Sequence, residues 1–272
     1  MSTRLGFPLV EQIDGHTVLT EGGRCLINLA TEMENRWKDV VHGLQDNATS
    51  EERTVVRLAA FSSAIGFSVA DAVQQLQQTT PITPYLTAIE PDVAQEFLKL
   101  GKVDAAVTIS AVQKRRDDNI KTYPLWRERF VLAAPENVRL SPAPGALEPD
   151  LARTSWILPP SGSVWEKLVN HFFERIDVRP RVVGRSDEWN LMQQMAARLD
   201  TATLVPITTF SRGNGVQVVP VEKSILPSRT VTLNVANRGN WLPMLFHSLC
   251  HAARASAHAF DKSPYFSCRF PE

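Results

Sequence analysis

Residues 20–45, TEGGRCLINLATEMENRWKDVVHGLQ, are the stretch around which the rest of the chain is organised. Thr20 is a good helix N-cap, and Glu21 puts an acid where the helix dipole favours one. Such a helix reaches roughly 35–40 Å. Its apolar residues recur every three or four positions, as in a coiled coil; they are Leu26, Ala30, Met33, Trp37, Val40 and Leu44. The pattern predicts a dimerisation helix over residues 21–45, and an amphipathic helix folded onto its own domain is the alternative.

Composition excludes several functional classes. Lys plus Arg number 29 and Asp plus Glu number 29, so no global charge favours nucleic acid or a membrane surface. Cys25, Cys250 and Cys268 are widely spaced and form no paired motif, which fits a reducing compartment. No signal-peptide pattern and no long apolar run is present. We therefore expect a cytoplasmic protein without a membrane partner.

The preceding stretch, residues 5–23, reads LGFPLVEQIDGHTVLTEGG and predicts a β-hairpin with Asp14-Gly15 at its tip. A hairpin followed by a long helix resembles the LysR-type transcriptional regulators, which carry LG-x-PLFER and V-x-LTEAG here. The matching residues are Leu5, Gly6, Pro8, Leu9, Glu11, Val18, Leu19, Thr20, Glu21 and Gly23. The resemblance implies that residues 1–20 are the wing of a winged helix-turn-helix and that the following helix is the dimerising linker.

Two departures from that family concern DNA binding. The family has its helix-turn-helix upstream of this motif, whereas this chain begins at Met1. Within residues 1–20 the only strong cation is Arg4, against Glu11 and Asp14. Because affinity for DNA rests on phosphate neutralisation and on a reading helix, we expect weak, nonspecific DNA binding. Either the start is truncated or the natural protein has given up direct DNA binding.

After a polar hinge at residues 45–53, the chain falls into two similar halves. Each half reads strand, serine-bearing turn, helix, strand, helix, strand, and 44 residues separate Ser63 from Val107 and Ser161 from Val205. Alternating strands and helices predict parallel sheets with right-handed crossovers. We therefore expect an α/β protein with two Rossmann-like lobes.

Two long β-rich segments connect these halves, YPLWRERFVLAAPENVRL at 123–140 and GVQVVPVEKSILPSRTVTLNVANR at 215–238, before a last helix around 241–259. One segment going out and one coming back is typical of periplasmic-binding-protein-like domains. The pattern also resembles the LysR effector domain, whose DLAIV, PL and E-x-LVLVAP correspond to 104–109 and 124–135. We expect an effector-binding domain over 53–262, with lobe I at 53–134 plus 220–262 and lobe II at 135–219.

Ligands of open α/β sheets bind beyond the carboxyl ends of the strands, near helix N-termini. Turns at such positions, together with the end of the last strand of lobe II, predict an effector site for a small anionic or polar molecule. Its residues are Ser62, Ser63, Ser161, Gly162, Ser163, Arg185, Val205 and Pro206. The alternative is that each serine only caps its own helix.

Other side chains carry weaker signals. His247, Cys250 and His251 share a face of the last helix, but one face rarely completes a metal site and Arg254 lies beside them. No G-x-S-x-G, P-loop or G-x-G-x-x-G motif occurs. We predict neither metal, cofactor nor enzymatic activity. We assign five of the six tryptophans to core or interface positions; they are Trp37, Trp156, Trp165, Trp189 and Trp241.

The functional expectation is a LysR-type regulator that binds a small-molecule effector between its lobes and forms a dimer or tetramer through the linker helix. DNA is a partner only if the full protein has a helix-turn-helix before Met1. Two alternatives stay open. One is a solute-binding protein of periplasmic type, and the other is a DNA-blind partner that forms mixed dimers with full-length relatives.

Overall fold

The N-terminal hairpin forms as expected in the computed structural model, which describes residues 8–13, 16–27, 29, 30, 33, 54–110, 119–138, 140, 147–222, 224–236 and 239–258. Strands β1 (Val10–Ile13) and β2 (His16–Leu19) pair antiparallel, with Ile13 opposite His16. Thr20 caps the following helix, because its Oγ1 accepts a hydrogen bond from the Gly23 N–H at 3.0 Å. Trp37, Val40 and Leu44 of the expected dimerisation seam lie outside the described residues.

The first lobe contains three parallel strands with helices between them, as the sequence predicts. β5 pairs with β3, and β3 with β4. All five residues of β5 are buried, and four of them are apolar, as expected of a parallel strand covered on both faces. The elements of this lobe are β3 (Thr54–Ala60), α3 (Ser62–Ala64), the π-helix η1 (Ile65–Val69), α4 (Ala70–Thr79), β4 (Ile82–Ala88), α5 (Pro91–Lys99) and β5 (Ala105–Ile109).

The second lobe repeats this arrangement, with β7 pairing parallel to both β8 and β9. Helix α6 (Leu147–Arg153) is not among the elements that the sequence predicts. Its Pro149 lies in the first helical turn, where the missing N–H of proline has no partner to lose. The other elements are β7 (Ser155–Leu158), α7 (Val164–Arg175), β8 (Arg181–Arg185), α8 (Trp189–Arg198), β9 (Ala202–Pro206), and the 3-10 turns η3 (Ile207–Thr209) and η4 (Arg212–Asn214).

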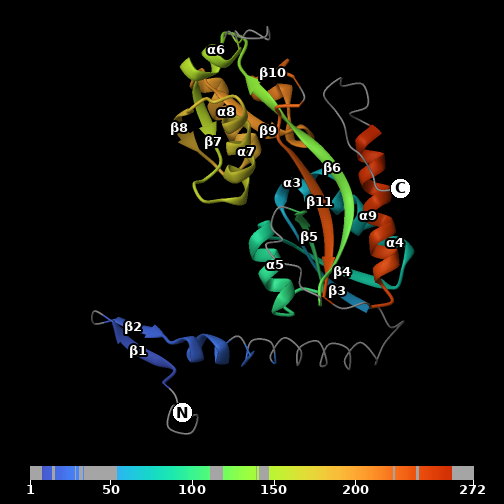
Figure 1. Ribbon diagram of the computed structural model, residues 1–272. Helices are drawn as coiled ribbons and strands as arrows, with labels where there is room; N and C mark the ends of the chain where they lie inside the picture. The colour runs from blue at the N-terminus through green and yellow to red at the C-terminus, as the bar shows by residue number, and fades with distance from the viewer. Residues whose placement is uncertain are drawn as a thin grey trace.

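Two long strands join the lobes, and they run side by side from one lobe to the other (Figure 1). β6 (Lys121–Ala134) pairs with β11 (Ser228–Val235) and then with β9 and β10 (Gln217–Val219). Within the described residues, nine strands form one sheet, in the order β4-β3-β5-β11-β6-β9-β7-β8 with β10 beside β6. The expected α/β class with two lobes and two crossover strands is therefore confirmed.

One hydrophobic core runs through both lobes. Among its fully buried side chains are Phe61 of the first lobe, Trp126 and Phe130 on the crossover strand β6, and Trp156 and Phe172 of the second lobe. The last helix, α9 (Leu242–His258), packs on α4 and η1. None of the described helices combines the length and the apolarity needed to cross a membrane.

Candidate functional site

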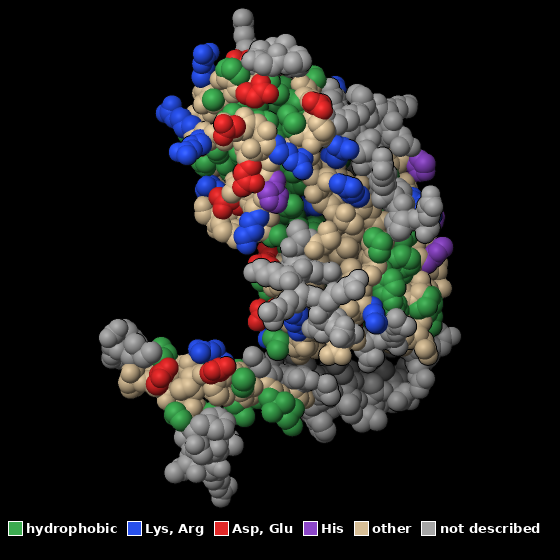
Figure 2. Space-filling view, in the orientation of Figure 1, with side chains coloured by type: hydrophobic (Ala, Val, Ile, Leu, Met, Phe, Trp, Pro, Cys, Tyr) green, Lys and Arg blue, Asp and Glu red, His purple; other side chains and the backbone are tan. Residues whose placement is uncertain are grey.

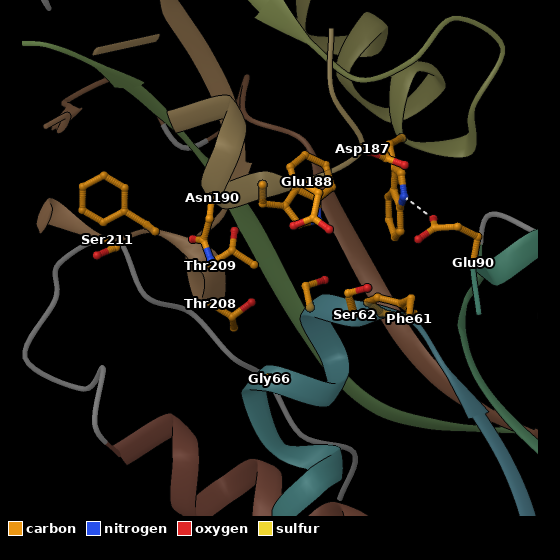
Figure 3. A pocket seen from close by; sticks show the side chains of 14 residues that line it. Phe61, Ser62, Gly66, Glu90, Asp187, Glu188, Asn190, Thr208, Thr209 and Ser211 are labelled. Carbon is orange, nitrogen blue, oxygen red and sulfur yellow. Dashed lines mark hydrogen bonds between the residues drawn. The ribbon is translucent and has the colours of Figure 1, made fainter. Parts of the chain in front are cut away.

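A cavity of about 350 Å³ lies between the lobes, at the carboxyl ends of strands from both of them. The first lobe contributes the start of α3 and the residue before α5. The second lobe contributes the start of α8, Trp165 of α7 and the turn after β9. Figure 3 shows Ser62 and Phe61 facing Glu188, with Asp187 and Glu90 at one end of the cavity and Thr208, Thr209 and Ser211 at the other. This is the position at which open α/β sheets bind ligands.

The first-lobe wall is polar and has room for a ligand. Ser62 is exposed, and the Ser63 hydroxyl accepts a hydrogen bond from Arg229 Nη2 at 2.9 Å. Gly66 follows in η1, and a Cβ at this position would meet no heavy atom within 4 Å. Single-turn π segments occur frequently at functional sites. A methyl group at residue 66 would therefore meet open space at the lining of the cavity.

A buried ion pair lies behind this wall. Arg229 Nη2 of β11 and Glu128 Oε1 of β6 are 2.8 Å apart, and their side chains are 0% and 1% exposed. Thr208, from the second lobe, donates to Glu128 Oε2 at 2.6 Å. The guanidinium also lies over the rings of Phe61, at 5.0 Å, and Trp165, at 4.9 Å. Because these contacts reach both lobes, the pair holds the back of the cavity in one arrangement.

The second-lobe wall comes from two short segments. Asp187, Glu188 and Asn190 stand exposed at the start of α8. The turn after β9 is held by Gln193, which is fully buried on α8. Its Nε2 donates to the Thr209 carbonyl at 2.9 Å, and its Oε1 accepts from the Ser211 N–H at 2.9 Å. One buried amide thus fixes the hydroxyl-bearing turn beside the start of α8.

Glu90 forms the rim of the cavity on the first lobe. Its Oε2 accepts a hydrogen bond from Trp165 Nε1 of the second lobe at 2.8 Å. Partial burial raises the pKa of Glu90 above its ordinary value, the Trp165 hydrogen bond opposes this, and the charges of Asp92 and Asp187 raise the pKa further. The carboxylate therefore connects the two lobes while repelled by its acidic neighbours.

The structure places four of the sequence-predicted site residues away from the cavity, gathered around Glu166 of α7. Gly162 N–H donates to Glu166 Oε2 at 2.7 Å, and Ser161 Oγ to Oε1 at 3.3 Å. Ser163 Oγ accepts from the Glu166 N–H at 3.0 Å, as in a capping box. Arg185 Nη1 bonds Glu166 Oε1 at 2.8 Å and the Pro159 carbonyl. The Gly162 N–H, and then Arg185, lower the pKa of Glu166.

Of the remaining predicted residues, Ser62 and Ser63 line the cavity, whereas Val205 and Pro206 are buried in β9. The residues missed by the sequence reasoning also follow strands: Glu90 follows β4, and Thr208–Ser211 follow β9. Applying the rule of strand carboxyl ends to every strand would have found them. Trp165 and Trp189 are core residues, as expected, and they also line the cavity.

A second cavity, of about 290 Å³, has a different character. It lies where β6 and the segment before β11 meet α7, and its lining includes Arg127, Arg129, Arg175 and His171. Arg127 Nη2 donates to Ser228 Oγ at 2.8 Å. Figure 2 shows Lys and Arg side chains gathered near a His on this face of the molecule. The basic side chains thus line this cavity, whereas acidic side chains line the one between the lobes.

On the last helix, two histidines face solvent and the cysteine between them is buried. His247 and His251 are exposed with their rings 6.4 Å apart, whereas Cys250 is 9% exposed. Burial raises the pKa of the Cys250 thiol. Among the described residues, no group of three or more His, Cys, Asp or Glu side chains is placed to hold a metal ion.

Comparison with known proteins gives a family and a fold. The family profile described as LysR substrate binding domain matches residues 49–255. A search by sequence against curated proteins found no match. Three solved structures resemble the chain: an H2O2-bound mutant of OxyR from Corynebacterium glutamicum, full-length BenM, and the effector binding domain of QuiR in complex with shikimate.

The OxyR structure is 16% identical with a TM-score of 0.63, and the alignment covers 94% of this chain and 81% of that one. The BenM structure is 18% identical with a TM-score of 0.60, and the alignment covers 97% of this chain and 87% of BenM. The QuiR domain is 17% identical with a TM-score of 0.60, and the alignment covers 75% of this chain and 98% of that domain. At sequence identities this low, the structural similarity shows a shared fold and nothing beyond it.

Proposed function

The chain belongs to the LysR substrate-binding domain family, and from this premise we propose that it is a LysR-type regulator whose effector binds in the cavity between the lobes. The observation that carries the proposal is the cavity itself, because it joins Ser62 and Ser63 of one lobe to Asp187–Asn190 and Thr208–Ser211 of the other. A ligand that contacts both walls favours one relative position of the lobes over the other.

The proposed division of labour follows the chain. Residues 53–134 with 220–262 form lobe I, and 135–219 form lobe II. The hairpin at residues 1–20 is the wing of a DNA-binding head, and the helix at 21–45 joins subunits. Supporting evidence for the helix is the exposure of its described apolar side chains, with Met33 64% and Leu29 52% exposed. Apolar side chains on a helix surface are typical of helix–helix interfaces.

Two variants of one residue test the site. Gly66→Phe fills the cavity, and Gly66→Ala adds a single methyl group in open space. We expect a ligand found by calorimetric screening of metabolites to bind the parent and Gly66→Ala, and to lose measurable binding to Gly66→Phe. Equal affinity for all three proteins would place the effector elsewhere.

A pair of serines tests the individual contacts. Ser62→Ala removes an exposed hydroxyl from the cavity, and we expect a roughly three- to tenfold weaker affinity, the value of one hydrogen bond. Ser163→Ala is the matched control, because this hydroxyl caps α7 away from the cavity. It should leave affinity unchanged and lower the free energy of unfolding by about 1 kcal/mol. Identical ligand affinities of both variants and the parent would mean that Ser62 makes no contact.

A further inference from the structure

The charges around the interlobe cavity are all of one sign. Glu90, Asp187 and Glu188 line it, and no Lys, Arg or His side chain does so within the described part of the chain. Figure 3 shows Asp187 and Glu90 at one end of the opening and Glu188 farther along it, opposite Ser62. An anion entering this space would meet repulsion from three sides, and a cation would meet attraction. Of the anionic or polar ligand that the sequence predicts, the lining therefore disfavours the anionic kind.

Two arginines of the surrounding structure do not change this balance. Arg185 donates hydrogen bonds to Glu166 and to the Pro159 carbonyl, next to the start of α7. Arg229 is 2% exposed, and its Nη2 forms an ion pair with Glu128 Oε1 at 2.8 Å. Both guanidinium groups are therefore paired with a carboxylate, and neither belongs to the lining of the cavity.

The apolar part of the lining also suits a cation. Phe61, Trp165, Trp189 and Phe210 all contribute to it. Aromatic faces attract ammonium and guanidinium groups through the ring quadrupole. Arg229 already lies over Phe61 and Trp165, which leaves Trp189 and Phe210 as the rings for a ligand.

Glu90 supplies an independent reason. Its side chain is exposed at the rim, where Asp92 and Asp187 oppose its ionisation and Trp165 and Arg229 favour it. A positive group bound among these carboxylates would relieve that repulsion, whereas an anion would add to it.

We propose that the cavity between the lobes takes a cationic ligand, a primary amine or guanidine carried on an apolar or aromatic body. The charge lies among Asp187, Glu188 and Glu90, and the body packs against Trp189 and Phe210. Hydroxyls of Ser62 and Thr208 accept or donate further hydrogen bonds. The inference rests on the proposed function, because it names the effector class of the same site.

A matched pair of ligands separates charge from shape. Phenethylamine and 3-phenylpropionate have the same ring and similar length but opposite charge. We expect calorimetric titration at pH 7.5 to show binding of phenethylamine, or of agmatine if a guanidine fits better, and no binding of 3-phenylpropionate in the interlobe cavity. The double variant Asp187→Asn/Glu188→Gln should weaken amine binding about tenfold.

The basic cavity supplies the location control. An anion that binds the protein there should be lost in Arg127→Gln/Arg175→Gln and kept in Gly66→Phe, whereas amine binding should show the opposite pattern.

Two outcomes would overturn the proposal in distinguishable ways. If 3-phenylpropionate binds, neither amine binds, and Gly66→Phe abolishes the binding of the anion, the cavity is an effector site and only its charge preference is wrong. If the two amines and the anion give no binding that Gly66→Phe removes, and the metabolite screen gives none either, both the charge preference and the proposed function fail.

Discussion

A single carboxyl group, Glu90, shows how function and stability oppose each other at the cavity. Its pKa in the folded protein is raised, chiefly by burial and then by Asp92 and Asp187, while Trp165 and Arg229 act in the opposite direction. A carboxyl group with a raised pKa stabilises the fold below its ordinary pKa of 4.5, and this contribution is lost as the pH rises through the folded-state pKa. At neutral pH the ionised Glu90 therefore costs stability.

The variant Glu90→Gln removes that cost. Its amide oxygen can still accept the Trp165 N–H bond, while the charge disappears. We expect a higher Tm than the parent at pH 8, with the difference narrowing as the pH is lowered toward the ordinary carboxyl pKa of 4.5, because the parent's carboxyl then takes up its proton. Thermal unfolding across this range checks the sign. A Tm lowered equally at every pH would mean that the hydrogen bond, and not the charge, governs stability here.

The crossover strands are coupled by one buried ion pair, which decides how the two lobes meet. Glu128 of β6 and Arg229 of β11 are almost fully buried, and their partners Ser63 and Thr208 come from different lobes. Removing one member of a buried pair leaves an uncompensated charge, which typically costs about 3–5 kcal/mol. The pair is a means of fixing the lobe arrangement more than a net source of stability.

A double variant tests this interpretation. We expect Arg229→Met to lower the free energy of unfolding by about 3–5 kcal/mol in urea titrations, because Glu128 is left buried and charged. Arg229→Met/Glu128→Gln should recover most of that loss, since the Thr208 hydroxyl can still donate to the amide oxygen. Additive losses in the double variant would show that the two residues act separately.

The elements were largely predictable from the sequence, and the site only in part. Strand and helix periods differ, so the strand–helix alternation was visible in segments such as β5 and α7. Helix α6 was hidden by Pro149, whose effect depends on its place in the helical turn. Ser62 and Ser161 looked alike, because a capping serine and a ligand-binding serine share the same local pattern. Only tertiary contacts distinguish them: the Ser161 hydroxyl donates a hydrogen bond to Glu166, whereas Ser62 lines the cavity.

The junction of hairpin and helix depends on a glycine. A Cβ on Gly23 would lie 2.0 Å from the Leu9 carbonyl oxygen, which is a backbone atom that cannot turn aside. The same oxygen accepts the Thr20 N–H at 3.1 Å. We expect Gly23→Ala to separate the helix start from the hairpin and to speed hydrogen exchange of the Thr20 amide. Unchanged exchange at Thr20 would show that the junction adapts to the methyl group.

At the scale of the whole molecule, the sheet is continuous between lobes, and this limits how they move. β6 pairs with β11 in its first part and with β9 near its end, so both lobes share one strand. Ligand-driven closure must therefore bend the crossover strands, and a helix attached before β3 would follow the first lobe. In this proposal, the relative position of two subunits carries the signal from the cavity.

Such signalling requires association, and the helix over residues 21–45 is the proposed interface. Its described seam residues leave apolar surface open, with Met33 64% exposed and Ala30 also exposed. Met33→Glu places a charge in that seam, and burying an unpaired charge costs several kcal/mol, roughly a hundredfold or more in dimer dissociation constant. We expect sedimentation to show a shift from dimer toward monomer. Glu21→Lys, which changes charge off the seam, should keep the parent's mass, and an unchanged mass of Met33→Glu would place the interface elsewhere.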